Sequence, residues 1–274
     1  KLLNENISDN YRKIIQNNLG NFPDLIETNK LNSEKPNKIG IDVGACIGET
    51  LNLFDNCDLV YAFEPSKEEF NILKEKVLGD ERIIPINCAI SDETGEQQLK
   101  CYENGRFSSF LDFNKESEFY EFCRDNVESF DNLKHIIPVK TIRLDDFMKK
   151  NNLTTIEYLK VDTQGTDLNV IKSLGEYLPN VKTIQTEVQL KELYKGSPTK
   201  EELMDFMDVN SFKLINKTYG EISKDYEQDF IFENNKIKKE KIDIVLQGKY
   251  NDNVLLISEY YLELDFVNNV IISC

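Results

Sequence analysis

Ile39-Gly-Ile-Asp-Val-Gly-Ala-Cys-Ile-Gly-Glu-Thr50, followed by Val60-Tyr-Ala-Phe-Glu-Pro65, is the part of the sequence that decides the fold. The apolar run over 39–43 predicts a buried strand, and the second stretch predicts another strand that ends in an acid. Gly44 and Gly48 allow the backbone after the first strand to turn sharply and to approach a ligand closely. A strand, a glycine turn, the start of a helix and a second strand are together typical of a nucleotide-binding unit.

The spacing of the glycines narrows the class of ligand. Dinucleotide-binding enzymes use G-x-G-x-x-G to bring a pyrophosphate to the N-terminus of a helix, whereas this chain has D-x-G-x-x-x-G with Asp42 before the turn. An acid at that position repels a pyrophosphate but suits a cationic ligand with an amino group, as in S-adenosylmethionine. Glu64, about 20 residues past the turn, is placed to accept hydrogen bonds from both hydroxyls of a ribose. The alternative is a purely structural turn in which Asp42 is a local cap.

The composition limits the class of partner. The chain has 274 residues, 40% of them hydrophobic and 30% charged, and a net charge of -16, which indicates a soluble globular protein. Proteins that bind nucleic acid carry basic faces, so we expect neither a nucleic acid nor an anionic membrane as partner. The first residues do not resemble a signal peptide, and no apolar run approaches the roughly 20 residues of a membrane span. We therefore predict a cytoplasmic protein without membrane insertion; the sequence leaves its oligomeric state open.

Cysteine and histidine argue against two other classes of protein. The six cysteines are scattered and form no C-x-x-C pair, which predicts reduced thiols rather than a disulfide framework. His135 is the single histidine, so a zinc site or a Ser-His hydrolase is disfavoured.

The chain divides into three predicted parts. Residues 1–35 are predicted to form a helical lead, 36–235 a doubly wound α/β domain, and 236–274 a linker with the incomplete start of a following domain. Within the α/β domain, residues 96–144 interrupt the alternation of strands and helices. We expect this insertion to shape substrate choice; the alternative is a plain surface excursion. The strands expected in the α/β domain are 39–43, 58–63, 83–88, 156–161, 181–187, 212–218 and 228–233, and the helices lie near 48–55, 67–77, 166–176 and 199–209.

Several sequence blocks occur in one order along this domain. They are Ile41-Asp-Val-Gly-Ala-Cys-Ile-Gly48, Ala62-Phe-Glu-Pro65, Asn87-Cys-Ala-Ile-Ser-Asp92, Ser108-Ser109, Thr141-Ile-Arg-Leu-Asp-Asp146 and Leu159-Lys-Val-Asp-Thr-Gln-Gly165, followed by Glu187 and Asp229. With these blocks, residues 36–234 resemble the FkbM family of S-adenosylmethionine-dependent methyltransferases. The chain departs from the family at Cys46, where Asn is common, and at Thr163-Gln164, where many members have Val-Glu. The second departure removes an acid from the region of the metal or substrate site.

The resemblance implies a fold and a set of cofactor contacts. The fold is a Rossmann-like class I methyltransferase fold, with a seven-stranded, mostly parallel sheet, helices on both faces and one antiparallel strand. The glycine turn would line the methionine end of S-adenosyl-L-methionine, Glu64 would hold the ribose, and the end of the third strand would flank the adenine. The implied cofactor-binding residues are Asp42, Gly44, Ala45, Gly48, Glu64, Ser66, Asn87, Ala89, Ile90 and Ser109.

Two acids are candidates for the chemistry. Asp162 ends the fourth predicted strand and Glu187 the fifth, so both are expected at the carboxyl edge of the sheet, where ligands of open parallel sheets bind. A sugar hydroxyl is a poor acid, and two carboxylates suit a general base, or the oxygen ligands of Mg²⁺ or another divalent cation that would acidify the hydroxyl. The alternatives are that Asp162 only caps the next helix and that Glu187 is a solvent-facing strand end.

These observations predict an O-methyltransferase that acts on a hydroxyl of a sugar or glycan. Residues 242–274 resemble the start of a WavE-like glycosyltransferase domain, from Ile244-Val-Leu-Gln-Gly248 to Asn269-Val-Ile-Ile-Ser-Cys274, which places the domain within a larger glycan-synthesising polypeptide. The rival hypothesis is a non-catalytic binding module beside a glycosyltransferase. A nicotinamide-dependent oxidoreductase is disfavoured because G-x-G-x-x-G is missing.

Overall fold

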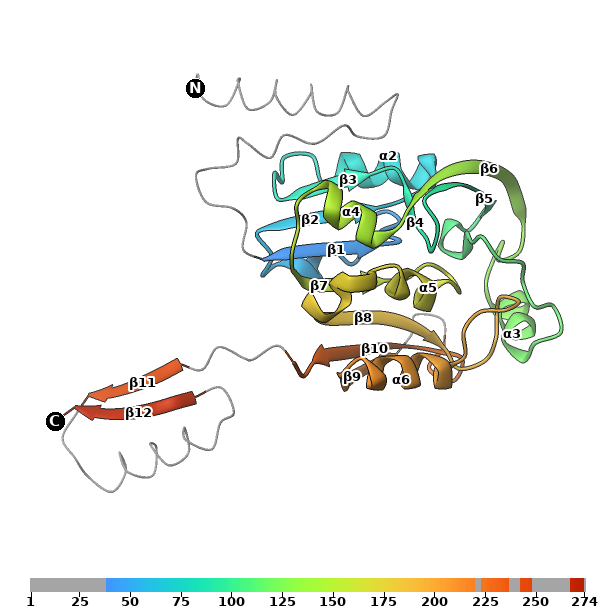
Figure 1. Cartoon of the computed structure of the whole chain (residues 1–274). Helices are drawn as coiled ribbons and strands as arrows, with labels where there is room; N and C mark the ends of the chain where they lie inside the picture. Colours follow the sequence, from blue (N-terminus) through green and yellow to red (C-terminus); the bar gives the residue numbers. More distant parts are fainter. Residues whose placement is uncertain (1–37, 220–222, 237–241, 248–266, 274) are drawn as a thin grey trace, which may run out of the picture. The chain divides into compact units, whose positions relative to one another are not determined.

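The structure is a computed structural model that describes residues 38–219, 223–236, 242–247 and 267–273 (Figure 1). The predicted helical lead over 1–35 lies outside these residues. The chain divides into two compact units, Lys1–Asn234 and Asn235–Cys274.

A seven-stranded sheet forms the centre of the first unit, with the strand order β3-β2-β1-β7-β8-β10-β9 (Figure 1). Neighbouring strands from β3 to β8 pair in parallel, and β10 pairs antiparallel with both β8 and β9. The fold is therefore Rossmann-like α/β with one antiparallel strand, which confirms the predicted fold class. The strands are β1 (Ile39–Val43), β2 (Leu59–Phe63), β3 (Ile83–Ile86), β7 (Ile156–Val161), β8 (Val181–Gln189), β9 (Phe212–Tyr219) and β10 (Glu227–Asn234).

Helices cover both faces of this sheet because its inner strands are apolar on both sides. In β2, Tyr61 and Phe63 pack edge to face against Phe147 of α4, whereas Val60 and Ala62 belong to the apolar cluster on the opposite face, together with Leu73 of α2. Strands buried on both faces read as continuous apolar runs, as β1 and β2 do. The helices are α2 (Lys67–Lys76), α4 (Leu144–Lys150), α5 (Asp167–Lys172) and α6 (Lys200–Val209).

Two of the predicted helices are shorter than expected. The helix predicted over 48–55 is only the 3-10 turn η1 (Leu51–Phe54), because Cys46 and Gly48 before it have φ values of 47° and 76°, which a right-handed helix cannot contain. The helix predicted over 166–176 ends at Lys172, and a 3-10 segment, η3 (Gly175–Asn180), follows it. In contrast, α6 begins as predicted, at the capping box formed by Thr199 and Glu202.

The insertion after β3 folds into a substructure of its own. Its strands β4 (Ala89–Ile90), β5 (Gly95–Tyr102) and β6 (Leu133–Ile142) form a three-stranded sheet in the order β4-β6-β5, and η2 (Gly105–Phe107) and α3 (Glu118–Asn126) lie between β5 and β6. A second core joins this insertion to the loop after β8. It consists of Tyr102, Phe107, Phe113, Phe119, Tyr120, Cys123, Phe130, Leu193 and Tyr194. The insertion is therefore a packed element that shares a core with the loop after β8, and its role in substrate choice stays a prediction.

The second unit contains a parallel pair of strands. β11 (Ile242–Gln247) and β12 (Val267–Ser273) pair over their whole length, and Ile244 lies opposite Val270. The assignment of these strands to a following domain stays a prediction.

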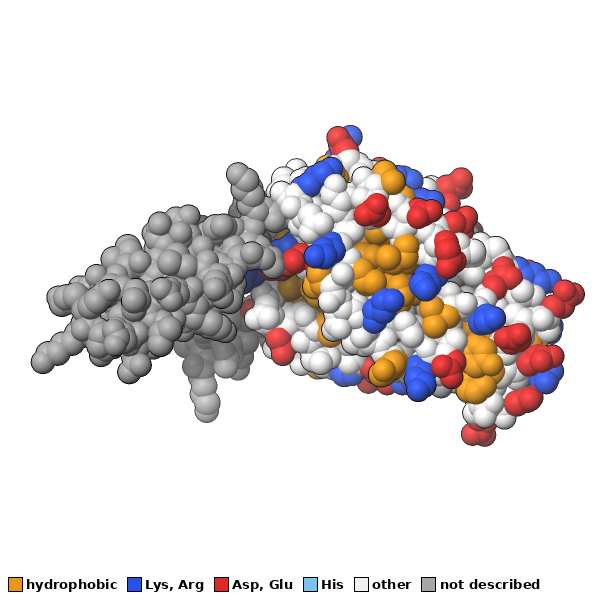
Figure 2. All heavy atoms as spheres, turned by 90° about the horizontal axis from the view of Figure 1, so that it is seen from below, with side chains coloured by type: hydrophobic (Ala, Val, Ile, Leu, Met, Phe, Trp, Pro, Cys, Tyr) orange, Lys and Arg blue, Asp and Glu red, His pale blue; other side chains and the backbone are white. Residues whose placement is uncertain are grey.

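The described surface carries charges of both signs. Figure 2 shows Lys and Arg side chains interspersed with Asp and Glu on one face. No helix within the described residues combines the length and the apolar character needed to cross a bilayer.

Candidate active site

A cavity of about 460 Å³ lies at the carboxyl ends of the central strands. Its floor comes from the ends of β1, β2, β7 and β8, and the insertion supplies the opposite wall through Asn104–Phe110 and the end of α3. Parallel α/β sheets bind ligands at this edge. Of the predicted site residues, the cavity is lined by Gly44, Ala45, Glu64, Ala89, Ile90, Ser109, Asp162 and Glu187.

The two glycines of the turn pack closely against other parts of the protein, and their predicted contact with the cofactor stays a prediction. Gly44 has a φ of 78°, and a Cβ atom there would lie 1.8 Å from the carbonyl oxygen of Asp162. Gly48 does not line the cavity; its Cβ would lie 2.8 Å from Leu51 and 2.9 Å from Leu73. Gly44 therefore lets the end of β1 pack against the end of β7, where Asp162 is held.

Glu64 presents its carboxylate to the cavity in a fixed orientation. Its Oε2 accepts a hydrogen bond from the backbone N–H of Cys46 at 3.0 Å, and its Oε1 accepts one from that of Ser66 at 2.7 Å. Burial raises the pKa of Glu64 to about 8, although both hydrogen bonds oppose the shift. Ser66 contributes its backbone and does not line the cavity, because its hydroxyl donates to Glu69.

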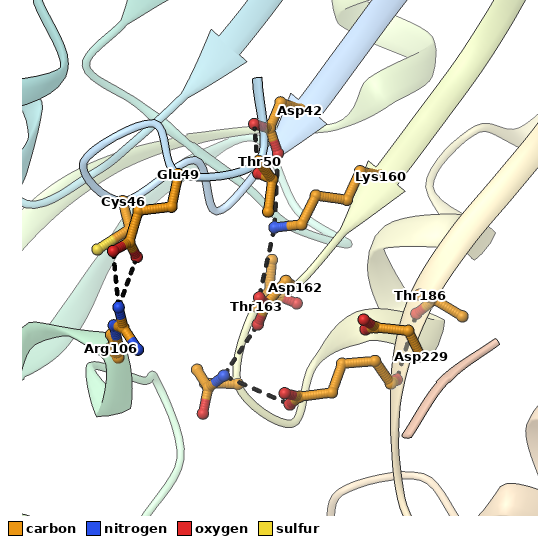
Figure 3. Close-up of polar contacts among 12 residues, drawn as sticks. Asp42, Cys46, Glu49, Thr50, Arg106, Lys160, Asp162, Thr163, Thr186 and Asp229 are labelled. Atoms are coloured by element: carbon orange, nitrogen blue, oxygen red, sulfur yellow. Dashed lines mark hydrogen bonds and ion pairs between the residues drawn. The ribbon is translucent and has the colours of Figure 1, made fainter. Parts of the chain in front are cut away.

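Asp42 lies beneath the cavity and does not line it, and its predicted contact with the cofactor stays a prediction. The side chain is fully buried, Thr50 donates to its Oδ2 at 3.3 Å, and the ammonium nitrogen of Lys160 lies 3.6 Å from its Oδ1 (Figure 3). Burial raises the pKa of Asp42, and the charge of Lys160 only partly offsets that effect. Asp42 therefore supports Lys160, which does line the cavity.

Lys160 is a site residue that the sequence analysis missed. Its ammonium group donates to Oδ2 of Asp162 at 3.3 Å, and the side chain is 5% exposed (Figure 3). Burial lowers its pKa, but Asp162 and Asp42 outweigh burial, so the pKa lies above its usual value. The signal in the sequence was a lysine within the otherwise apolar end of a buried strand, Leu159-Lys-Val161.

The side chain of Gln164 forms hydrogen bonds to both Asp162 and Glu187. The amide nitrogen of Gln164 donates to Oδ1 of Asp162 at 2.9 Å and to Oε2 of Glu187 at 3.3 Å. Glu187 also lies opposite Asp229 in the register of β8 and β10. Burial, and then the charge of Asp162, raise the pKa of Glu187. A carboxyl group with a raised pKa next to a second carboxylate is a suitable arrangement for a general base.

The capping role considered for Asp162 is wrong. Thr166 is the residue before α5, and the free amides of the preceding loop are bound by Asp167, which accepts from Thr163 at 2.9 Å and from Gly165 at 3.2 Å. The side chain of Asp162 is therefore available to the cavity.

The comparisons with known proteins identify the family. The family model described as the methyltransferase FkbM domain matches residues 42–214, which is more than half of the chain. The chain belongs to the FkbM methyltransferase family. It is accordingly an S-adenosylmethionine-dependent methyltransferase by family, and the predicted resemblance is confirmed.

One curated relative and two solved structures illustrate the similarity. The 2-O-methyltransferase NoeI of Sinorhizobium fredii (strain NBRC 101917 / NGR234) is 27% identical over 213 residues, which cover 74% of this chain and 82% of NoeI. TrmK of M. capricolum, solved with S-adenosyl-homocysteine, is 12% identical with a TM-score of 0.34; the match covers 73% of this chain and 63% of TrmK, less than two thirds of its length. The magnesium protoporphyrin IX methyltransferase ChlM from Synechocystis PCC 6803, solved with bound SAM, is 10% identical with a TM-score of 0.39, and the match covers 72% of this chain and 70% of ChlM.

The residues predicted to flank the adenine separate into two groups. Ala89 and Ile90 are buried and line the cavity, and their contact with an adenine stays a prediction. Asn87 is exposed and does not line the cavity; its amide donates to the backbone carbonyls of Glu64 and Pro65, both at 2.9 Å. Asn87 therefore holds the backbone beside Glu64, and its predicted contact with the cofactor stays a prediction.

An ion pair connects the insertion to the glycine turn. Nη2 of Arg106 in η2 lies 2.7 Å and 2.8 Å from the two carboxylate oxygens of Glu49, and both residues line the cavity (Figure 3). Both side chains are more than a third exposed, so solvent weakens their attraction. The sequence analysis assigned no role to either residue.

No disulfide joins the cysteines of the described residues. The described cysteines Cys46, Cys57, Cys88, Cys101 and Cys123 are free thiols. Burial, and then the charge of Glu64, raise the pKa of Cys46 to about 12, so this thiol is protonated at neutral pH and unreactive.

The donor set does not support the predicted divalent cation. Among the described residues, no group of three or more His, Cys, Asp or Glu side chains is arranged to hold a metal ion. Asp162 already accepts from Lys160 and Gln164, and Glu187 accepts from Gln164. Three of the four carboxylate oxygens of Asp162 and Glu187 thus accept from nitrogen donors.

Proposed function

We propose that the chain transfers the methyl group of S-adenosyl-L-methionine to a hydroxyl of a sugar or glycan. The observation that carries the proposal is that one cavity contains both Glu64 and the pair Asp162 and Glu187. Glu64 follows β2 and Asp162 follows β7, and β1 lies between these two strands. Neighbouring strands lie about 4.8 Å apart, so two spacings separate Glu64 from Asp162 by roughly 10 Å. That separation suits a ligand whose ribose is bound at one strand and whose reacting end lies over another.

The cofactor side of the cavity fits the chemistry of the proposed ligand. The Glu64 carboxylate is fixed by two backbone amides and has remaining lone pairs for the two hydroxyls of a ribose. The buried apolar residues Ala89 and Ile90 provide a surface for an adenine ring. S-adenosyl-L-methionine supplies a methyl group activated on a sulfonium, so the oxygen–carbon bond can form as the sulfur–carbon bond breaks and S-adenosylhomocysteine leaves.

The acceptor side has the groups that a weakly acidic hydroxyl requires. In this proposal Asp162 accepts the hydroxyl proton. The Lys160 ammonium and the Glu187 carboxyl group set the net charge around Asp162. Phe107, Phe110 and Phe122 on the insertion wall give the cavity the mixture of apolar and polar lining that small-molecule sites have. The name of NoeI, a 2-O-methyltransferase, supports oxygen as the methylated atom.

Calorimetry and mass spectrometry test this proposal. Titration with S-adenosylhomocysteine should give one site per chain, and incubation with isotopically labelled S-adenosylmethionine and a panel of methyl glycosides should give a product that is heavier by the labelled methyl group. Absence of S-adenosylhomocysteine binding would refute the cofactor assignment. Methylation of nitrogen or carbon acceptors instead of glycosides would refute the acceptor class.

The rival proposal is a non-catalytic module of the same fold. A fold does not establish activity, and this rival predicts either no cofactor binding or binding without turnover on any glycoside. The intact pair of Asp162 and Glu187 favours catalysis. The larger glycan-synthesising polypeptide, the cytoplasmic location and the absence of a nucleic-acid partner stay predictions.

A further inference from the structure

We propose that the amide group of Gln164 occupies the position between Asp162 and Glu187 that a divalent cation would take, so that this site positions its two carboxylates without a metal. The inference rests on the proposed function, because it concerns how the acceptor side of that site is organised. It assigns Gln164 as a positioning residue.

The contacts of the Gln164 amide nitrogen carry this inference. The nitrogen donates to Oδ1 of Asp162 at 2.9 Å and to Oε2 of Glu187 at 3.3 Å, so it uses both of its hydrogens on the two carboxylates. An amide N–H₂ group is a donor and has no lone pair to offer a metal ion. The nitrogen therefore holds the two carboxylates next to each other by hydrogen bonds and does not coordinate a cation.

The orientation of the amide is set from its other side. Tyr194, which is fully buried, donates its hydroxyl to Oε1 of Gln164 at 2.9 Å and lies 3.0 Å from the carbonyl oxygen of Phe107. If the amide were turned over, its oxygen would face two carboxylates, and like partial charges would repel. Tyr194 thus selects the orientation in which the nitrogen faces Asp162 and Glu187.

The backbone of Gln164 is also held in an unusual conformation. Its φ is 53°, a left-handed conformation that a residue with a side chain adopts rarely. The hydroxyl of Ser109, from the insertion, donates to the carbonyl oxygen of Gln164 at 2.7 Å. Such conformations persist where the surroundings fix them, and they occur often at active sites. The insertion therefore fixes the backbone of Gln164 through Ser109.

Positive charge reaches the carboxylates from the protein itself. Lys160 donates to Oδ2 of Asp162, on the carboxylate oxygen that Gln164 leaves free. A cation at this place would supply positive charge and a fixed geometry. Here Lys160 supplies the positive charge, and Gln164 supplies the fixed geometry.

Binding of Mn²⁺, followed by the electron paramagnetic resonance signal of the free ion, tests the proposal on the full chain. We expect the unaltered protein to leave the free Mn²⁺ signal unchanged. Gln164→Glu places a third carboxylate beside Asp162 and Glu187, and we expect this variant to bind one Mn²⁺ per chain, displaceable by Mg²⁺. Asn104→Asp adds an acid elsewhere in the cavity wall and should gain no Mn²⁺ binding. Calorimetry with S-adenosylhomocysteine and thermal unfolding check that each variant is folded.

Two results would overturn the inference from the metal side. The first is Mn²⁺ binding by the unaltered protein that Asp162→Asn abolishes, together with loss of turnover in EDTA. The second is a folded Gln164→Glu variant that binds no Mn²⁺, because the amide would then not occupy a place that a cation can take.

A second variant tests positioning and keeps the inference falsifiable if Gln164→Glu does not fold. Gln164→Leu removes both donors at similar volume, and we expect kcat to fall about 100-fold, as for misplaced catalytic groups, while KM for S-adenosylmethionine changes by less than about threefold. The pH profile of kcat should also shift, because two carboxylates lose a shared donor. Unchanged kcat and pH profile would overturn the positioning role. The Mn²⁺ measurement needs no turnover, so failure of the proposed function, seen as absent S-adenosylhomocysteine binding or methylation, is distinguishable from failure of this inference.

Discussion

Asp42 of β1 lies opposite Lys160 of β7 in the parallel register, with 3.6 Å between the carboxylate Oδ1 and the ammonium nitrogen, in the interior of the sheet. Both side chains are at most 5% exposed. Lys160 also reaches Asp162 at the cavity, so the pair connects the buried strand β1 to the candidate base. The acid that the motif places before the glycine turn therefore acts on the site through a lysine.

Lys160→Met should destabilise the protein strongly. Removing one partner of a buried ion pair leaves Asp42 without compensation, which costs about 3–5 kcal/mol of unfolding free energy. Urea unfolding of the variant and the unaltered protein measures the difference. Lys182→Met, on the neighbouring strand, breaks the Lys182–Glu157 pair, whose lysine is 42% exposed, and should cost at most about 1 kcal/mol. Equal losses in the two variants would contradict a special role for the buried pair.

Glu64→Gln should weaken the binding of S-adenosylhomocysteine. An amide at this position cannot accept from Cys46 and Ser66 with both of its polar atoms, and it offers the ribose a neutral group in place of a carboxylate. Hydrogen bonds to charged groups contribute about 1.5–3 kcal/mol, so we expect a loss of affinity of roughly 10- to 150-fold by calorimetry. Glu75→Gln, exposed on α2, is the matched control and should leave the affinity unchanged. Retained affinity in Glu64→Gln would place the ribose elsewhere.

The stability of the ligand-free protein should depend on pH through Glu64. Its pKa is raised from 4.5 to about 8, so between these pH values the folded state binds more protons than the unfolded chain. The contribution of Glu64 to the unfolding free energy is therefore present at low pH and is lost as the pH rises to about 8. Compared with the unaltered protein, Glu64→Gln should gain relative stability from pH 5 to pH 8, as measured by urea unfolding. A constant difference across this range would show that Glu64 is ionised in the folded state throughout.

Gly44→Ala should disrupt the site. The added Cβ would lie 1.8 Å from the carbonyl oxygen of Asp162, a backbone atom that cannot move aside without shifting β7, and the φ of 78° adds strain. We expect a loss of more than about 3 kcal/mol in unfolding free energy, beyond the usual effect of a surface substitution. Gly95→Ala is the control, because its Cβ would meet no atom within 4 Å. A folded Gly44→Ala variant of unchanged stability would contradict the close packing of β1 on β7.

Asp162→Asn should abolish turnover and spare cofactor binding. Loss of a general base lowers kcat by about 100- to 10,000-fold, whereas the Glu64 contacts to the cofactor are unaffected. Single-turnover assays on the best glycoside and calorimetry with S-adenosylhomocysteine separate the two effects. Asp205→Asn, exposed on α6, is the control for both. Turnover within threefold of that control would remove Asp162 from the mechanism.

Local sequence patterns sufficed for the sheet and for the ends of its strands. Each strand of the seven-stranded sheet overlaps a predicted strand, and apolar runs mark the inner strands β1 and β2 because buried parallel strands need apolar side chains on both faces. The short segments were less predictable. The helix expected over 48–55 is only a 3-10 turn, because Cys46 adopts a left-handed conformation that cannot be predicted from its residue type.

Some features of the candidate site follow from the sequence, and others are determined only by the tertiary structure. The order of the motifs alone indicated that Glu64 and Asp162 directly follow parallel strands and that Glu187 lies near the end of another, two residues before the last residue of β8, because parallel strands bring their carboxyl ends to one edge. Only the tertiary structure decided that Asp42 is buried against Lys160 and that Gln164 joins the two candidate carboxylates. These contacts depend on the register between strands and on an insertion that reaches back over the cavity, and neither is encoded in the spacing of residues within a motif.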